Sequence, residues 1–495
     1  MKTNSIVRQF SMALGSAILC SCLPIALAAN VESRPDPREI PVPWIEGPLG
    51  RMPGPDDLPL RKEMPDIMTM NDGSRVTSLE QWQKRREEMK VILQYYCVGQ
   101  MPPPPGNVTG KEIATEMVQD GKVRYRLMRL TFGPQEKLSL DIGIWTPATG
   151  GPFPTIINQA GTPPGGVVLP RLHRGFGRLG VDVLLPVDEI KRQVAAKVAA
   201  AGAAADEEPP TSAERGGRRG EATAEAAAQR YAEVFRRGYA LVLFNHNDCA
   251  EDTTLRMPDG SWAFRTTRFP PAYPEYDWGV IGAWAWGISR IADYLETDPV
   301  IDGKKLIITG ASRSGKAAMF AAAFDNRLMG APVVTGGGGV GAFRYAGPRN
   351  SETLDLMMKK LPNWFSPNLH DFWGHREKLP FDQHWFLALC APTPFLSLEG
   401  DTDRISLPEA VRQSVLHAKP AYALYDAADR IGVHFSHHSH AFTDEDWTAL
   451  MNFADRHLRG KRDCTFDWFP NDAELDAAAA NPGPGGGARA IQAVR

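Results

Sequence analysis

The chain has 495 residues, of which 43% are hydrophobic and 23% are charged, and it contains 12 tryptophans. These values exclude intrinsic disorder over most of its length, because such a chain has enough apolar surface to bury a large core. A formal net charge of -3 without a long basic stripe argues against nucleic acid as a partner, since positive fields are what gather phosphates. Length alone does not require two cores, and we expect one large domain with extensions.

The first 28 residues predict export. A basic start is followed by an apolar run and by the sequence Ala-Leu-Ala ending at Ala28, which is typical of a cleaved signal peptide. Because Gly15 and Pro24 interrupt the apolar run, cleavage is favoured over a membrane anchor. We expect a soluble mature protein in the periplasm or outside the cell, with a lipid anchor at Cys22 as the weaker alternative.

Residues 29–105 are rich in proline and charge, which predicts an N-terminal extension that wraps around the rest of the protein. One helix is expected within it, near residues 78–96. Its apolar spacing predicts that Leu79, Trp82 and Val91 face a core.

Two other segments are expected to lie outside the core. Residues 188–230 are rich in Ala, Arg and Glu with few large apolar side chains, which predicts a solvent-exposed insertion with some helix. Residues 461–495 are predicted to form a partly disordered tail.

Four cysteines remain after cleavage of the signal peptide. They lack the close pairs of a zinc site, and the sequence allows one or two disulfides without assigning them. They are Cys97, Cys249, Cys390 and Cys464.

Residues 106–460 have the pattern of an α/β domain. Two apolar segments at 123–132 and 138–145, separated by a polar turn, predict an antiparallel hairpin. Short apolar runs then alternate with helical segments, including helices near 278–296 and 445–458. The runs lie at 154–158, 239–244, 305–309, 331–334, 395–398 and 422–425. This alternation predicts a mainly parallel, twisted sheet covered by helices on both faces.

The run at 305–309 leads into a turn of small residues that ends at Ser312, and then into an alanine-rich helix. This is the pattern of a nucleophile elbow, in which a sharp strand-to-helix turn exposes a serine oxygen. Ser312 is therefore the candidate nucleophile. The generic motif is only partly satisfied, because Gly315 follows the serine by three residues instead of two.

A phosphate-binding loop is the alternative interpretation of this segment. Gly310 and Gly315-Lys316 have the separation that such a loop requires. Ala317, however, stands where a Ser or Thr hydroxyl should meet Mg²⁺, so the elbow is favoured.

A nucleophilic serine needs a base, and in α/β-hydrolase folds the base comes last in the chain, after an acid. His440 meets this requirement, because it lies after the last predicted strand and before the final helix. His434, His437 and His438 are rivals, and such a cluster could instead hold a metal. The base is favoured because no other segment supplies a metal-ligand set. We expect no metal and no organic cofactor.

The acid is expected in the loop after the run at 395–398. A carboxylate there can orient His440 and stabilise its charged form during proton transfer. Asp403 is the first candidate, with Asp401 and Glu399 behind it.

Together these residues resemble the glucuronoyl esterases, carbohydrate esterase family 15, which belong to the α/β-hydrolase superfamily. The family motif Gly-Cys-Ser-Arg-x-Gly-Lys corresponds here to residues 310–316, with alanine in place of the cysteine. The resemblance spans roughly residues 142–458. Further matches lie at 379–384, 391–392, 408–409 and 440–458.

The resemblance implies that Ser312 attacks an ester of a glucuronate carboxyl group. It also implies that the backbone N–H and the guanidinium of Arg313 stabilise the oxyanion, which suits an N–H directly after the nucleophile. Lys316, one helical turn beyond Ser312, would donate to a sugar hydroxyl. The expected substrate-binding residues are Lys316, Glu352, Gln383 and Trp385. For Glu352, a solvated loop carboxylate remains the other interpretation.

Two departures from the family pattern bear on the site. Many members place the acid after the strand that follows the nucleophile helix, but residues 332–336 contain no carboxylate. This shifts the role to Asp403, as in a subset of bacterial members. Ile405 stands where the family has a sugar-stacking Trp, so Trp385 or Trp364 would have to contact the uronate ring.

The sequence thus predicts a secreted serine esterase that cleaves esters between glucuronate on xylan and lignin-type alcohols through an acyl-enzyme. Its expected partner is glucuronoxylan or its oligosaccharides. An acetyl or other carbohydrate esterase of the same fold is one alternative, because Ile405 weakens uronate recognition. A non-catalytic carbohydrate-binding relative is the other. We expect no stable membrane insertion, since no later segment is long and apolar enough.

Overall fold

The computed structural model describes residues 42–169, 172, 223–345 and 351–461. The predicted signal peptide with Cys22, the insertion up to residue 222 and the tail beyond residue 461 lie outside the described residues. Inside them, no helix combines the length and the hydrophobicity that crossing a bilayer would take.

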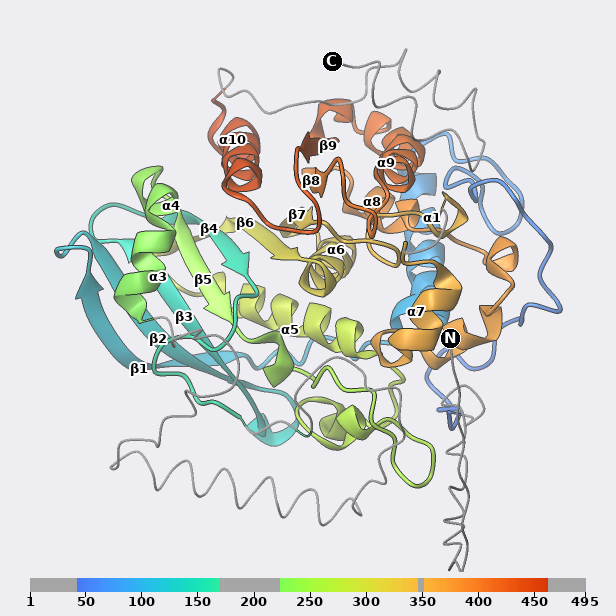
Figure 1. Cartoon of the computed structure of the whole chain (residues 1–495), viewed down its shortest axis with the longest axis horizontal. Helices are drawn as coiled ribbons and strands as arrows, with labels where there is room; N and C mark the ends of the chain where they lie inside the picture. The colour runs from blue at the N-terminus through green and yellow to red at the C-terminus, as the bar shows by residue number, and fades with distance from the viewer. Residues whose placement is uncertain (1–41, 170–171, 173–222, 346–350, 462–495) are drawn as a thin grey trace, which may run out of the picture.

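A nine-stranded sheet forms the centre of the molecule (Figure 1). Its strands occur in the order β1-β2-β3-β5-β4-β6-β7-β8-β9. The pairs from β1 to β5 along this order are antiparallel, and those from β5 to β9 are parallel. The strands are β1 Thr109–Val118, β2 Val123–Phe132, β3 Leu138–Pro147, β4 Phe153–Asn158, β5 Ala240–Phe244, β6 Ile301–Ala311, β7 Leu328–Val333, β8 Phe395–Gly400 and β9 Ile431–Ser436.

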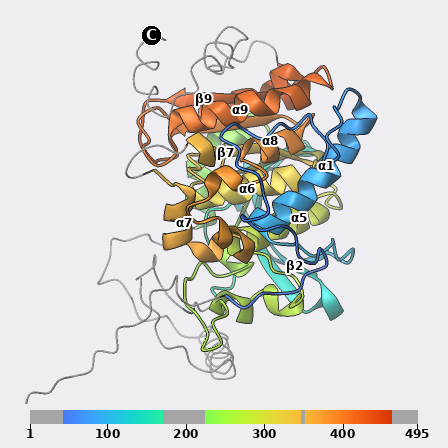
Figure 2. The ribbon, with the colours of Figure 1, turned by 90° about the vertical axis from the view of Figure 1, so that its right-hand side faces the viewer.

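Helices cover both faces of this sheet. One core lies under α1, α5, α6, α7, α8 and α9, and Figure 2 looks onto this side; the other lies under α3, α4 and α10. The helices are α1 Leu79–Leu93, α3 Ala224–Arg230, α4 Ala232–Arg236, α5 Val280–Leu295, α6 Arg313–Phe324, α7 Leu354–Lys360, α8 His384–Cys390, α9 Pro408–Ala423 and α10 Asp444–Arg459. A π-helical turn, η1 Gln94–Val98, continues α1. Short 3₁₀ turns are η2 Pro134–Glu136, η4 His246–Asp248, η5 Ala263–Thr266, η6 Pro270–Ala272, η7 Phe343–Tyr345, η8 Pro362–Trp364, η9 Pro367–Phe372, η10 Arg376–Lys378 and η11 Ala428–Arg430.

Strand β6 shows why this arrangement forms. Successive side chains of a strand point to opposite faces, and here Leu306 and Ile308 enter one core while Ile307 enters the other. A parallel strand that is covered on both faces needs such an unbroken apolar sequence. The predicted α/β class is confirmed, with a mainly parallel sheet between two helical layers.

One predicted strand was wrong, and two strands of the sheet were not predicted. The run at 422–425 lies at the end of α9 and just beyond it, because Val411, Val415, Ala418 and Tyr422 recur at helical spacing and pack into the core. The last strand is instead β9, which contains His434. Strand β1 escaped prediction because it is an exposed edge strand with a mostly polar sequence.

Helix α1 forms where it was predicted, but its buried face differs from the prediction. Leu79 and Val91 are 44% and 36% exposed, whereas Trp82 is fully buried together with Met89 and Leu93. The reason is periodicity: the buried residues follow one stripe of the helix, and Leu79 and Val91 lie off that stripe.

The end of the predicted insertion also differs from expectation. In α3, Ala224, Ala227 and Ala228 are buried against the sheet, and Trp145 Nε1 donates a hydrogen bond to the Ala224 carbonyl at 3.1 Å. Small side chains allow this helix to lie close to the strands, so a low content of large apolar residues did not mean exposure here. One face of α3, formed by these three alanines, therefore belongs to the second core.

Cys97, Cys249 and Cys390 are buried free thiols, so these three form no disulfide with one another. Burial raises the pKa of each thiol, which keeps it protonated and unreactive. They act as small apolar side chains of the core.

Candidate active site

Ser312 lies at the junction of β6 and α6 with a strained backbone. Its φ of 57° and ψ of -122° are unfavourable for a residue with a side chain, and such strain is typical of nucleophile elbows. The backbone is held by a hydrogen bond from Ser312 N to the Val333 carbonyl at 2.9 Å. The side chain does not cap α6, and the residue is partly exposed. The turn therefore presents the hydroxyl at the carboxyl end of the parallel strands.

Two glycines make this turn possible. A Cβ on Gly310 would lie 2.9 Å from Ser314, and one on Gly315 would lie 2.8 Å from the Gly310 carbonyl oxygen. Both distances are shorter than real Cβ contacts. Gly315 is thus needed where α6 crosses the end of β6, which accounts for the unusual spacing after the serine.

His440 is paired with Asp403. The Nδ1 atom of His440 lies 2.8 Å from Asp403 Oδ2, and the carboxylate is almost fully buried. Burial tends to raise the pKa of Asp403, but hydrogen bonds from His440 and from the Ile405 N–H, with the His440 charge, outweigh it and lower the pKa below its usual value. Asp403 is therefore ionised at neutral pH, and its hydrogen bond leaves His440 Nε2 for proton exchange.

The rival histidines 437 and 438 have different partners. His437 binds Asp401 at 3.0 Å, but its side chain is 75% exposed, so solvent screens this pair. His438 lies 3.2 Å from Asp446. The same Asp446 accepts hydrogen bonds from Thr443 in the capping box of α10, which gives this carboxylate a structural role.

His434, the remaining rival, is buried in β9 and lies 3.0 Å from the Ser436 hydroxyl. In the part of the chain that the structure describes, no three His, Cys, Asp or Glu side chains are grouped so as to hold a metal ion. The histidine-rich segment is thus divided between a strand and a loop, with a separate partner for each imidazole.

Glu399, a minor candidate for the acid, has an unsuitable environment. It is fully buried at the end of β8 and accepts a hydrogen bond from Ser397 Oγ at 2.7 Å. Burial, with the nearby negative charge of Asp403, raises the pKa of Glu399 to about 8. A carboxyl group that stays protonated at neutral pH cannot stabilise an imidazolium as an anion.

Lys316 and Glu352 contact each other beside the elbow. The Lys316 side chain is fully buried, and its ammonium donates to the Thr335 carbonyl and to Glu352 Oε2, the latter at 2.8 Å. The Glu352 N–H in turn donates to the Ile405 carbonyl at 3.4 Å. These contacts tie α6 to the loop that carries Asp403. The glutamate is thus no solvated loop carboxylate but the partner of a buried cation.

Arg313 has a carboxylate partner that the sequence analysis missed. Its guanidinium donates to Asp252 Oδ2, and Asp252 Oδ1 accepts a hydrogen bond from Trp364 Nε1 at 2.7 Å. The Arg313 guanidinium and the Lys316 ammonium lie 5.6 and 5.4 Å from the centre of the Trp364 ring. The available signal was a carboxylate in the loop after β5, at the same edge of the sheet as Ser312.

Gln383 and Trp385, which were expected to contact the sugar, lie in the interior. Trp385 is 2% exposed, donates from Nε1 to the Pro65 carbonyl at 3.0 Å and packs its ring against Arg85. The Gln383 side chain is fully buried. The structure does not bring these two side chains to the surface of the site, because α8 turns them into the core under the N-terminal segment.

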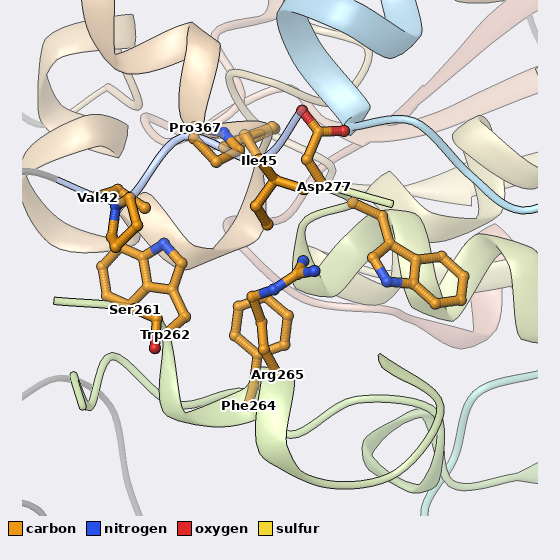
Figure 3. A pocket seen from close by; sticks show the side chains of 11 residues that line it. Val42, Ile45, Ser261, Trp262, Phe264, Arg265, Asp277 and Pro367 are labelled. Carbon is orange, nitrogen blue, oxygen red and sulfur yellow. The ribbon is translucent and has the colours of Figure 1, made fainter. Parts of the chain in front are cut away.

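A cavity of about 50 Å³ is lined by other residues than Ser312, Asp403 and His440. Figure 3 shows the Arg265 side chain reaching into it between Trp262 and Asp277. Its volume suffices for a few water molecules and not for a sugar ring. Because of this small volume, we assign the cavity no part in substrate binding. Burial raises the pKa of Asp277, which lines it, to about 6.

Sequence comparisons show which proteins this chain resembles. Residues 217–427 match a family model described as "Glucuronyl esterase, fungi". The chain is 28% identical over 419 residues to "Carbohydrate esterase MZ0003" from an unknown prokaryotic organism, a match that covers 80% of this chain and 90% of the relative. It is 26% identical over 357 residues to a 4-O-methyl-glucuronoyl methylesterase of Podospora anserina, and this match covers 69% of the chain and 56% of that relative.

Solved structures show the same fold. A carbohydrate esterase family 15 glucuronoyl esterase from Caldicellulosiruptor kristjansonii is similar with a TM-score of 0.57 and 28% identity, over 85% of this chain and 97% of that one. A mutant glucuronoyl esterase from Sporotrichum thermophile, in complex with methyl 4-O-methyl-beta-D-glucopyranuronate, matches with the same TM-score over 86% of this chain and 96% of that one. Its identity is 21%, which supports the fold alone.

Proposed function

Because the chain belongs to the glucuronoyl esterases, carbohydrate esterase family 15, and is therefore a carboxylic ester hydrolase, we propose that it cleaves esters of (4-O-methyl-)glucuronate through a serine-bound acyl-enzyme. The proposed natural bonds join glucuronate on xylan to lignin-type alcohols. The observation that carries the proposal is the pairing of His440 with the buried Asp403, at the same carboxyl end of the parallel strands as the strained Ser312.

The first half of the reaction forms the acyl-enzyme. Ser312 Oγ attacks the carbonyl carbon of the ester while His440 Nε2 takes the hydroxyl proton, and ionised Asp403 stabilises the resulting imidazolium. The negative charge that develops on the carbonyl oxygen is stabilised by the Arg313 N–H at the start of α6 and by its guanidinium. When the carbon–oxygen bond breaks, the alcohol leaves with the proton from His440.

The second half releases the acid. A water molecule gives a proton to His440 and attacks the acyl carbon, and the bond to Ser312 Oγ then breaks as the serine regains its proton. The products are the regenerated enzyme and the uronic acid, which releases its proton to solvent and becomes the carboxylate. Each half of the reaction begins with a neutral His440 and passes through its charged form, and the Asp403 hydrogen bond holds the ring in place and stabilises that charge in both halves.

The uronate ring is proposed to bind beside Lys316 and Glu352. These two side chains already pair with each other next to α6, so their positions are set before a ligand arrives. The predicted contact of Lys316 with the sugar does not fit its fully buried ammonium, which instead fixes Glu352, and the partly exposed carboxylate of Glu352 can accept from a sugar hydroxyl. Ile405 offers no aromatic face at its position, which predicts weaker stacking than a Trp would supply.

A substrate panel tests the proposal. Purified wild type and Ser312→Ala are assayed on benzyl glucuronate, acetylated xylan and p-nitrophenyl acetate. We expect wild-type turnover on the glucuronate ester well above that on the acetates, and none with Ser312→Ala. Preference for acetylated xylan would instead identify an acetyl esterase. Xylo-oligosaccharide binding without turnover of any ester would identify a carbohydrate-binding relative.

We also propose that the protein is exported. The support is the N-terminal pattern of basic residues, an apolar run and Ala-Leu-Ala before residue 29. The intact mass of the mature protein from a bacterial host should correspond to a chain that begins at Ala29. A mass increased by lipid at Cys22 would indicate the anchored form instead.

A further inference from the structure

We propose that Asp252 is a positioning residue for the reaction, which holds the Arg313 guanidinium beside the nucleophile. This inference rests on the proposed esterase function. Asp252 comes from the loop after β5, whereas Arg313 begins α6, and 61 positions separate them in the sequence. Asp252 is not one of the three proposed catalytic residues Ser312, Asp403 and His440, and it acts on the reaction through Arg313.

The two oxygens of Asp252 have different tasks. Oδ2 accepts from the guanidinium, while Oδ1 accepts from Trp364 Nε1 at 2.7 Å and from Asn363 Nδ2 at 3.5 Å. The Asp252 backbone is itself held, because its N–H donates to Asn247 Oδ1 at 3.1 Å. The carboxylate is thus anchored on the side away from Arg313.

Partial burial strengthens this ion pair and lets it fix the conformation of Arg313. The Asp252 and Arg313 side chains are 11% and 23% exposed, so solvent screens them less than a surface pair. An arginine side chain has many rotamers, and a fixed carboxylate that accepts from its planar fork restricts it to one of them. The Trp364 ring, 5.6 Å away, limits the guanidinium on a second side.

The two cations of α6 are therefore held separately, Lys316 by Glu352 and Arg313 by Asp252. Both approach the same Trp364 ring, and without a carboxylate beside each they would repel one another. For Arg313 the consequence is preorganisation. Its guanidinium, on the residue directly after Ser312, already has a fixed partner before an oxyanion forms, which is the condition under which such stabilisation is most effective.

Steady-state kinetics of Asp252→Asn tests this role. Asparagine keeps an acceptor for Trp364 Nε1 but loses the charge that fixes Arg313. We expect kcat on benzyl glucuronate to fall about tenfold to a hundredfold with KM changed less than about threefold, because the oxyanion forms after binding. Asp252→Glu should restore part of kcat. Asp259→Asn, an exposed carboxylate in the same segment, is the matched control and should leave kcat unchanged.

A double-mutant cycle with Arg313→Gln separates positioning from a structural role. If Asp252 acts through Arg313, Asp252→Asn should lower kcat far less in the Arg313→Gln background than in the wild type. An equal loss in both backgrounds, or no loss in either, would overturn the proposal. Melting temperatures identify variants whose kcat falls because the fold is weakened.

A second readout keeps this test independent of the substrate assignment. The rate at which a fluorophosphonate labels Ser312 depends on stabilisation of a negative phosphoryl oxygen and needs no uronate. Asp252→Asn should slow labelling, and Asp259→Asn should not. Normal labelling of Asp252→Asn would contradict the inference even if no glucuronate ester is turned over. Failure on glucuronate esters with slowed labelling would reject only the proposed substrate.

Discussion

Three carboxyl groups within five positions, at residues 399, 401 and 403, have three different chemical states in this protein. Glu399 is buried and protonated, Asp401 faces the exposed His437, and Asp403 is buried but ionised because His440 and a backbone N–H bind it. Residue type and spacing alone do not distinguish them. What separates them is the local environment of each carboxyl group. Burial raises the pKa of a carboxyl group, whereas hydrogen bonds to its ionised form lower it.

Replacing each aspartate by asparagine tests the choice between them. Asp403→Asn should lower kcat by roughly a thousandfold or more, because an amide neither stabilises the imidazolium nor holds the required tautomer. Asp401→Asn, the matched control on the same loop, should change kcat less than about threefold, since its ion pair is screened. The measurement is kcat on the best substrate of the panel. The reverse order of effects would assign the acid to Asp401.

At the scale of elements, the site depends on how closely α6 approaches the ends of β6 and β7. Gly310 and Gly315 face each other there, and Gly315 also lies against Val333 and Thr335. A helix that begins directly after the nucleophile can only cross these strand ends where two side chains are missing. The elbow is thus a property of the strand, the turn and the helix together.

Gly315→Ala should disturb the elbow. Its methyl group would lie 2.8 Å from the Gly310 carbonyl, so α6 must shift, and we expect a loss of about 1–3 kcal/mol in unfolding free energy with a strong loss of kcat. Ala321→Gly in the same helix is the control, expected to cost about 1–2 kcal/mol through helix propensity and the loss of a buried methyl group while activity persists. Chemical denaturation and kcat are measured on both. An unchanged kcat in Gly315→Ala would show that the elbow tolerates a wider approach.

At the scale of the whole molecule, segments remote in sequence cover one another. Arg86 on α1 donates to the Ala391 carbonyl at 2.7 Å and to Asn326 at 2.8 Å, and Trp82 is fully buried beside it. The N-terminal segment is therefore part of the main core. The same packing encloses Trp385 and removes it from contact with a substrate. Burial at this scale also leaves protonated carboxyl groups inside the fold.

Glu399 makes the stability of the molecule depend on pH. Its pKa is about 8 in the folded protein against an ordinary value of 4.5, so the folded state holds a proton that the unfolded state releases. Stability from this group is complete below about pH 4.5 and is lost as pH rises to about 8. Relative to Glu399→Gln, the wild type should lose roughly a few kcal/mol across this range. Urea unfolding of both proteins at several pH values measures the difference, and a constant difference would contradict the assignment.

The amino-acid sequence alone determined the local and ordered features of this protein. An apolar run followed by small residues predicts the turn at Ser312, and alternating runs predict the α/β class. The order of Ser312, Asp403 and His440 makes each a candidate. These features depend on neighbours within a few residues, where backbone geometry and periodicity act directly.

The tertiary structure decided which side chains meet. It paired Asp252 with Arg313, paired Lys316 with Glu352, and enclosed Gln383 and Trp385 in the core. None of these contacts can be derived from the spacing of residues in the sequence. The order of the strands in the sheet decides which loops meet at their carboxyl ends, and in that order β4 lies between β5 and β6. Burial and charge environment, which govern the chemistry of each group, arise only after these distant segments have packed together.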